Sequence, residues 1–368
     1  MKKLILLFLA LVAIAMGANA ATDYGITIAG TIVNSDNYLS ASEGMAWSYD
    51  PTTNIFYLKE GEIYSDKTNG IRISGDVNPS LKICVVGNCE LWGKFNSGIS
   101  FSGNGNHIIY GTGTLNINSM LVGATGISVN EGAPKVTFKD LTVNIKLYGG
   151  NGFACNFFDS IIFDHCDFTI TTTDGIAMIG TTENGFTPQF ILCRANRGWV
   201  SDSSGMGFRG TAGEDLFAPN VKITRSIKYV NVKVDEPVEG QKPATTATAL
   251  SSGYKITTLS WFKVDDTNLY SMRSDEVFTA NVSYKVSFRL EAEGDSVFAY
   301  DDVSNAAVVP VVNGKRAEYF KATTSKDAGM EYTFPPLGYE EFNLWVGGTQ
   351  VSSMNCNDVL GDGKISYD

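Results

Sequence analysis

The chain has 368 residues, a formal net charge of −11 and no basic stripe, which argues against nucleic acid or an anionic membrane as the partner. Thirty-eight glycines, only 18% charged residues and abundant Thr, Asn, Val and Ile favour an all-β protein with many turns. At this length, two domains are expected rather than one.

Residues 1–20 predict a secretory signal peptide. Lys2 and Lys3 precede an apolar stretch, from Leu4 to Met16, that is too short to cross a bilayer comfortably. The tripeptide Ala18-Asn19-Ala20 has the small-residue pattern of a cleavage site. We therefore expect a bacterial protein that is secreted or held at the cell surface after cleavage near Ala20. No later stretch is long and apolar enough to predict a membrane span.

Residues 24–69 predict a cap at the N-terminal end of a solenoid. Within them, two alternating runs flank the turn Asp50-Pro51-Thr52-Thr53-Asn54, which indicates a hairpin. A solenoid needs such a cover, because an open end exposes both its apolar core and unpaired strand edges.

A glycine followed by an apolar residue recurs between residues 70 and 210, at intervals of 23 to 30 residues. The pairs are Gly70-Ile71, Gly98-Ile99, Gly126-Ile127, Gly152-Phe153, Gly175-Ile176 and Gly205-Met206. Each pair opens a unit that contains two further short apolar runs separated by turn residues. This period predicts a right-handed parallel β-helix of about six coils, with three strands in each coil. Together with its cap, the β-helix is expected to span residues 21–234.

The third apolar runs of the coils can be aligned without gaps, which predicts the two faces of one sheet. The alignment sets Leu91, Leu115, Val143 and Phe168 in one inward ladder, with Ile117, Ile145 and Ile170 in the next. The residues between them face outward on a flat surface rich in amide and hydroxyl groups, with Trp92 near one end and Tyr148 near the side. Aromatic rings can stack on sugars while amides and hydroxyls bind the sugar hydroxyls. The candidate carbohydrate contacts are Trp92, Asn116, Asn144, Lys146, Tyr148 and Asp167.

The composition changes after the β-helix. Residues 235–253 are rich in Pro, Thr, Ser and Ala and predict a linker. Residues 254–337 contain longer alternating runs joined by Asp, Asn and Gly turns, which predicts a small immunoglobulin-like β-sandwich. Its expected core residues are Trp261, Val286, Phe288, Leu290, Phe298 and Phe334.

The last segment repeats the first. Residues 342–368 align without a gap on residues 24–50 at an offset of 318, with identities such as Gly30/Gly348 and Val33/Val351. We therefore expect residues 338–368 to be the truncated start of a second copy of the N-terminal module, within a longer natural protein.

The six cysteines show neither a disulfide framework in their spacing nor a Cys-x-x-Cys metal pattern. They are Cys84, Cys89, Cys155, Cys166, Cys193 and Cys356. Several of them fall within apolar runs, so we expect small buried residues that fill the solenoid core.

Several motifs resemble a family of secreted bacterial β-helix proteins described as carbohydrate-binding domain proteins. The resemblance rests on Tyr24 to Asn37, Ser48 to Leu58, Gly98-Ile99 and Gly111 to Asn118. It implies a right-handed parallel β-helix similar to that of pectate lyases, and binding of plant-type or acidic polysaccharides, with calcium as a candidate cofactor. It brings no set of functional residues that can be matched to this chain.

An enzymatic alternative depends on one corner of the β-helix. Asp164 and Asp167 flank His165 and could share a calcium ion, with Arg194 and Arg197 on the next coil as candidate bases. The simpler interpretation is that these carboxylates are solvated corner residues. The Asn-Thr-Asp, Asp-Asp and Gly-His-Gly motifs of polygalacturonase-like enzymes do not occur together in the chain, and we expect no catalytic residue.

The preferred functional prediction is an exported, non-catalytic polysaccharide-binding protein. One alternative is a calcium-dependent polysaccharide lyase that acts on acidic glycans. The other is a structural surface or adhesin repeat protein, in which the modules form a stalk.

Overall fold

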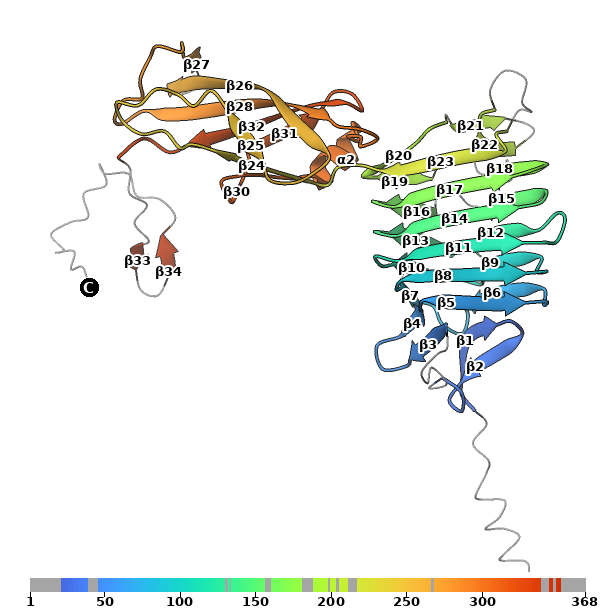
Figure 1. Ribbon diagram of the computed structural model, residues 1–368. Helices are drawn as coiled ribbons and strands as arrows, with labels where there is room; N and C mark the ends of the chain where they lie inside the picture. The colour runs from blue at the N-terminus through green and yellow to red at the C-terminus, as the bar shows by residue number, and fades with distance from the viewer. Residues whose placement is uncertain are drawn as a thin grey trace, which may run out of the picture.

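The computed structural model describes residues 21–38, 46–129, 132, 134–155, 160–180, 188–197, 199–202, 205–210, 217–265, 268–338, 344–346 and 349–351. The predicted signal peptide, Cys356 and most of the predicted second copy lie outside these residues. The chain forms a β-solenoid of about five turns, followed by a separate region of mainly antiparallel sheets (Figure 1). Within the described residues, no helix is long and apolar enough to cross a membrane.

Three long sheets make up the solenoid. Sheet A contains, in spatial order, β2 (Thr31–Asn34), β1 (Asp23–Ile28), β6 (Asn69–Ser74), β9 (Ser97–Ser102), β12 (Thr125–Val129), β15 (Gly150–Cys155), β18 (Gly175–Gly180), β22 (Gly205–Phe208) and β21 (Trp199–Asp202). Sheet B contains β19 (Gln189–Ile191), β16 (Ile161–Asp164), β13 (Lys135–Lys139), β10 (Asn106–Tyr110), β7 (Lys82–Val85), β4 (Ile55–Leu58) and β3 (Trp47–Asp50). Sheet C contains β20 (Cys193–Ala195), β23 (Asn220–Arg225), β17 (Asp167–Thr172), β14 (Thr142–Leu147), β11 (Thr114–Ser119), β8 (Asn88–Gly93) and β5 (Gly61–Ser65).

Strands of successive turns pair in parallel, so the predicted all-β parallel solenoid is confirmed. The turn count is corrected from about six to about five. Gly205-Met206, the last of the recurring Gly-apolar pairs, lies in β22, which pairs antiparallel with β18. The parallel stacking of sheet A therefore ends at β18, and a hairpin of β21 and β22 follows it.

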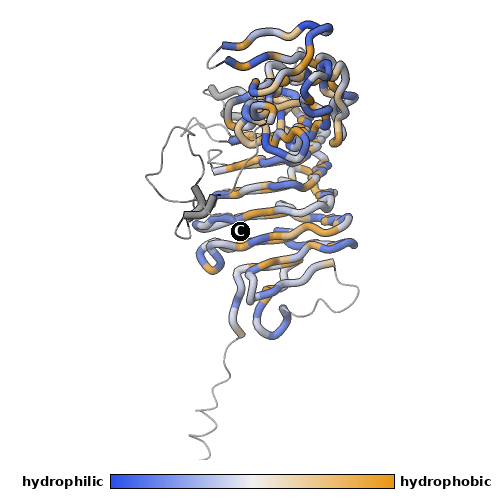
Figure 2. Tube along the Cα trace, turned by 90° about the vertical axis from the view of Figure 1, so that its left-hand side faces the viewer, coloured by the Kyte–Doolittle hydropathy of each residue, from blue (hydrophilic) through white to orange (hydrophobic). Residues whose placement is uncertain are grey.

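The glycines of the recurring Gly-apolar pairs are called here the glycine ladder. They lie where sheets A and C approach each other closely. A Cβ added to Gly98 would lie 2.5 Å from Cγ2 of Ile117 and 2.5 Å from the carbonyl oxygen of Gly126. The same 2.5 Å distances separate a Cβ on Gly126 from Ile145 and from Gly152. Each glycine thus leaves room for the inward isoleucine of the facing strand. Along the stacked turns, apolar and polar stretches alternate (Figure 2).

The N-terminal cap is shorter than the predicted residues 24–69. The β1–β2 hairpin does cover the solenoid, because Ile28 pairs antiparallel with Ile71 of β6. However, β4 and β5 pair in parallel with β7 and β8. Residues from Ile55 onward therefore belong to the first turn of the solenoid.

The C-terminal region contains two sheets that share one hydrophobic core. The first consists of β25 (Ala247–Ala249), β24 (Tyr229–Val234), β29 (Val309–Val312) and β30 (Lys315–Arg316), and the second of β27 (Asn268–Ser271), β26 (Tyr254–Asp265), β28 (Ser283–Ala292), β32 (Asp327–Phe334) and β31 (Tyr319–Ala322). The short helix α2 (Asp302–Ala307) precedes β29. All six predicted core residues from Trp261 to Phe334 are buried. The strand β24, expected at the end of the β-helix, instead pairs with β25 of the predicted linker and with β29.

The sequence repeat is matched by a structural repeat. The strands β33 (Leu344–Val346) and β34 (Thr349–Val351) form a hairpin in which Leu344 pairs with Val351. In the N-terminal hairpin, Ile26 pairs with Val33. Each of these positions is related to its counterpart by the same offset of 318 residues, so the two hairpins have the same register.

Candidate functional site

The candidate carbohydrate contacts lie mainly on the outer face of sheet C, called here the sheet C face. The predicted alignment sets Leu91 beside Leu115, and therefore Trp92 beside Asn116. This part is corrected, because Trp92 pairs with Asn118. The difference is two residues, so Trp92 keeps its outward direction. It arises because Cys89, which is fully buried, takes the inward place beside Leu115 that the alignment assigned to Leu91.

An amide ladder runs along the sheet C face. Nδ2 of Asn116 donates to Oδ1 of Asn88 at 2.7 Å, and Nδ2 of Asn144 donates to Oδ1 of Asn116 at 2.9 Å. Beside it, Nδ2 of Asn118 donates to Glu90 at 2.9 Å. These hydrogen bonds fix the direction of each amide before any ligand arrives. Asn116 and Asn144 are half-buried and in register with each other, whereas Asn88 is exposed and pairs with Thr114.

An aromatic pair stands at one end of the sheet C face. The rings of Tyr64 and Trp92 pack edge to face with centroids 4.7 Å apart, and Tyr64 remains 49% exposed. Nε1 of Trp92 donates to Glu62 at 3.1 Å, which holds the indole in place. The sequence does not predict Tyr64 as a contact, because residues 61–65 fall within the predicted cap. The apolar–polar alternation of that segment is the signal that could have placed it on the face.

Lys146 and Tyr148 occupy different places. Lys146 is exposed in β14 and pairs in register with Asn118 of the sheet C face. Tyr148 follows the end of β14 and is 56% exposed at the corner, where its carbonyl accepts from the amide of Gly123. Tyr148 therefore borders the sheet C face rather than lying within it.

Asp167 lies at the other end of the face and is engaged by a cation. Nε of Arg225 donates to Asp167 at 2.6 Å, and the Arg225 backbone amide donates to the other carboxylate oxygen at 2.8 Å. The same guanidinium also donates to Thr142 at 3.1 Å. Two residues further along β17, Thr169 pairs with the exposed Lys222 of β23. This end of the face is therefore basic, whereas Glu62 and Glu90 make the opposite end acidic.

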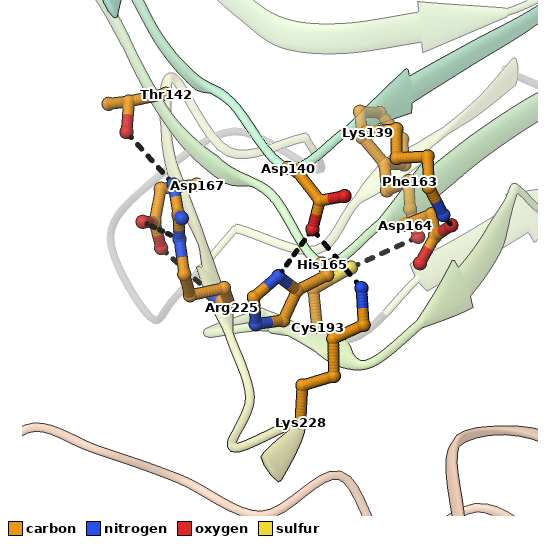
Figure 3. A network of polar contacts seen from close by, with 10 residues as sticks. All are labelled: Lys139, Asp140, Thr142, Phe163, Asp164, His165, Asp167, Cys193, Arg225 and Lys228. Carbon is orange, nitrogen blue, oxygen red and sulfur yellow. Dashed lines mark hydrogen bonds and ion pairs between the residues drawn. The ribbon is translucent and has the colours of Figure 1, made fainter. Parts of the chain in front are cut away.

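The predicted metal ligands Asp164 and Asp167 each have a different partner. Asp164 pairs with Lys139 of the preceding turn, while Asp167 pairs with Arg225 (Figure 3). Across the described residues, there is no group of three or more His, Cys, Asp or Glu side chains that could hold a metal ion. Each of the two carboxylates thus forms an ion pair within the protein.

Between these ion pairs, His165 and Asp140 form a hydrogen-bonded pair at the corner of sheets B and C (Figure 3). Burial lowers the pKa of His165 below its ordinary value, against the opposing effect of Asp140. Burial raises the pKa of Asp140, but His165 and the nearby Lys228 lower it more, so the net shift is downward. Near pH 7, neutral His165 donates Nδ1–H to Asp140 over 2.7 Å, which leaves Nε2 as an acceptor.

The candidate bases Arg194 and Arg197 meet Trp199 at a cavity of about 270 Å³ beyond β20. The guanidinium of Arg194 lies 4.8 Å from the ring centroid of Tyr300, which the C-terminal region contributes. Trp199 packs edge to face on Phe208 at 5.2 Å. Ala299, Tyr300 and Asp301 also line this cavity, so it lies where the end of the solenoid meets the C-terminal region.

Comparison with known proteins gives no significant match to a family model, to a curated protein or to a solved structure. The resemblance to carbohydrate-binding β-helix proteins therefore depends on the sequence motifs quoted above and on the solenoid fold.

Proposed function

We propose that this protein binds polysaccharide along the sheet C face and does not cleave it. The observation that carries the proposal is the amide ladder Asn88–Asn116–Asn144 on the same face as the aromatic pair of Tyr64 and Trp92, of which Tyr64 is exposed. Amides fixed by one another offer sugar hydroxyls a row of hydrogen-bonding groups at a small cost in conformational entropy. The aromatic pair offers an apolar surface on which a sugar ring can stack.

The cations at the β23 end of the face favour an acidic glycan there, although Glu62 and Glu90 make the aromatic end acidic. Lys146 and Lys222 are exposed and lie toward the same end as the Asp167–Arg225 pair. A carboxylate-bearing chain that extends from the aromatic end toward β23 would meet these cations in turn. Two exposed lysines contribute mainly to attraction and orientation, and their effect falls with added salt.

We also infer that the C-terminal region is an immunoglobulin-like sandwich that acts as a spacer for an exported protein. The two sheets with a shared core support the sandwich, and the signal-peptide pattern at residues 1–20 supports export. Display on the bacterial surface and release into the medium both remain compatible with this proposal.

A second candidate function is a polysaccharide lyase. It is favoured by the neutral His165, which Asp140 orients and which lies near Lys228. An imidazole of this kind could remove the proton α to a sugar carboxylate while a cation neutralises the carboxylate. The calcium-dependent form of this alternative is weakened, because both Asp164 and Asp167 already have cationic partners.

The decisive experiment mixes the protein with polygalacturonate, as an acidic glycan, or with a neutral glucan, each with and without calcium. Co-sedimentation measures binding, and ultraviolet absorbance of unsaturated products measures cleavage. Retention without product supports the proposal, whereas product supports the lyase. Absence of both supports the structural alternative and contradicts binding.

A matched pair of variants tests the location of the site. Lys146→Glu places a negative charge on the sheet C face, whereas Lys233→Glu places one on an exposed position of β24. Binding of polygalacturonate should fall several-fold in the first variant at low salt and stay unchanged in the second. Equal binding by both variants would exclude the proposed face.

A further inference from the structure

The solenoid brings two cysteines together at the corner between sheets B and C. In this region β16 and β19 are parallel neighbours, with Phe163 beside Phe190 and Asp164 beside Ile191. The pairing continues past the strands, because the amide of His165 donates to the carbonyl of Ile191 at 2.8 Å. Two residues beyond Asp164 and Ile191, Cys166 and Cys193 occupy equivalent places in consecutive layers.

Their thiols are in contact inside the core. Cys166 is 0% exposed and Cys193 is 2% exposed. The Cys193 thiol donates to the carbonyl of Phe163 at 3.1 Å, and the Cys166 thiol forms a hydrogen bond with Cys193. The Cys193 thiol therefore points toward the layer that carries Cys166, and both cysteines are free thiols in the structure. A disulfide between them requires Cα atoms about 4.4 to 6.8 Å apart.

We propose that Cys166 and Cys193 form a disulfide that ties the fifth turn of the solenoid to the strands that close it. The reaction releases one proton from each thiol and transfers two electrons to a disulfide oxidant, which is reduced to two thiols. The bond closes the loop from residue 166 to residue 193, so it restricts the unfolded chain and stabilises the fold. The proposal does not depend on polysaccharide binding.

The surroundings determine when the bond can form. Burial and the neighbouring Cys193 thiol raise the pKa of Cys166 well above its ordinary value. Since the thiolate is the species that attacks a disulfide, the folded, reduced protein should react slowly. Oxidation therefore belongs to folding, before the corner closes over the two sulfurs.

The test is refolding of the denatured, reduced chain in a buffer of reduced and oxidised glutathione, followed by alkylation under denaturing conditions and peptide mapping. The expected result is a cross-linked pair of peptides that contain Cys166 and Cys193 and separate on reduction. Full alkylation of both cysteines after oxidative refolding would overturn the proposal. The mapping uses the wild-type chain, so it does not depend on a variant that folds.

A stability comparison adds the matched control. Oxidised protein should melt roughly 5–10 °C above reduced protein in the wild type. The same difference should persist in Cys89→Ala, whose buried thiol lies on β8, and should vanish in Cys193→Ala. A difference that survives in Cys193→Ala would assign it to another pair of cysteines and contradict the proposal.

Discussion

Tyr64 and Trp92 occupy register positions on the neighbouring strands β5 and β8, with ring planes inclined by 62°. The pair begins a continuous row of polar groups, because Trp92 is in turn beside Asn118 on β11. A parallel solenoid repeats each outward position once per turn, so short side chains on successive turns add up to one extended surface. This addition of small contacts is what suits the sheet C face to a polymeric ligand.

The amide ladder should contribute more to binding than to folding. Asn116→Ala removes the hydrogen bonds with Asn88 and Asn144 and frees both amides to rotate. We expect a roughly tenfold loss of polysaccharide affinity, while the free energy of unfolding falls by about 1 kcal/mol. Calorimetric titration and urea unfolding measure the two effects. Asn268→Ala, on the exposed strand β27, is the control, and an equal loss of affinity there would contradict the prediction.

Substitution of a glycine in the glycine ladder by alanine should destabilise the fold. In Gly126→Ala, the new Cβ would lie 2.5 Å from both Ile145 and the carbonyl of Gly152, so the sheets must separate. We expect the unfolding free energy to fall by about 1–3 kcal/mol. In Gly329→Ala the new Cβ has no atom within 4 Å, and stability should stay within about 0.5 kcal/mol. Similar urea midpoints for both variants would show that the ladder has another cause.

The periodic part of the fold could be predicted from sequence because each turn repeats the same packing requirement. The Gly-apolar pairs located sheet A, and alternation in the third runs separated inward from outward residues. Alternation repeats every two residues, so it cannot detect a register shift of two residues. Such a shift places Cys89, instead of Leu91, beside Leu115.

Long-range contacts account for most of what the sequence did not predict. Arg225, the partner of Asp167, is 58 residues away in the sequence. It lies on an antiparallel strand whose pairing the sequence repeat does not predict. Similarly, β24 alternates like a solenoid strand but pairs with β29 of the C-terminal region. A strand pattern shows which residues face a core, whereas the identity of that core depends on the partner strand.

His107 should make the fold sensitive to acid. In the described part of the chain, neither ring nitrogen of this buried side chain has a hydrogen-bond partner, and burial lowers its pKa from 6.5 to about 4. The unfolded chain therefore binds a proton more readily between these values. Stability is complete above about pH 6.5 and falls by about 3 kcal/mol as the pH approaches 4.

The variant His107→Leu should remove most of this slope. Urea unfolding at several pH values between 4 and 7 measures it, and the slope that remains should belong largely to His165, whose pKa is also lowered by burial. If the wild type and the variant lost stability in parallel as the pH fell, the assignment to His107 would be wrong.

Calcium should have little effect on the folded protein. Lys139 and Arg225 already neutralise Asp164 and Asp167, so a calcium ion would have to displace two internal cations. We expect millimolar calcium or a chelator to change the melting temperature by less than about 1 °C, because a ligand stabilises only in proportion to its binding. An increase of several degrees with calcium, lost in Asp164→Asn, would instead support the metal site.

The two hairpins with matching register should be exchangeable. Replacement of residues 26–33 by residues 344–351 keeps apolar residues at the positions of Ile26, Ile28 and Val33, which are buried against the solenoid. We expect a folded chimera that is less stable by about 1–3 kcal/mol, because the apolar residues differ in shape. A control exchange that is displaced by one residue turns those positions outward and should prevent folding of the cap. Equal stability of the two chimeras would contradict the structural repeat.

The most direct test of polysaccharide binding is the affinity of the double variant Tyr64→Ala/Trp92→Ala for polygalacturonate and for a neutral glucan, measured by affinity electrophoresis. The control is Tyr270→Ala/Tyr319→Ala, which removes two exposed rings from the C-terminal region. Binding through the sheet C face predicts at least a tenfold loss for the first variant, with melting temperature nearly unchanged, and no loss for the control. Wild-type affinity in the first variant, or an equal loss in both, would contradict the account.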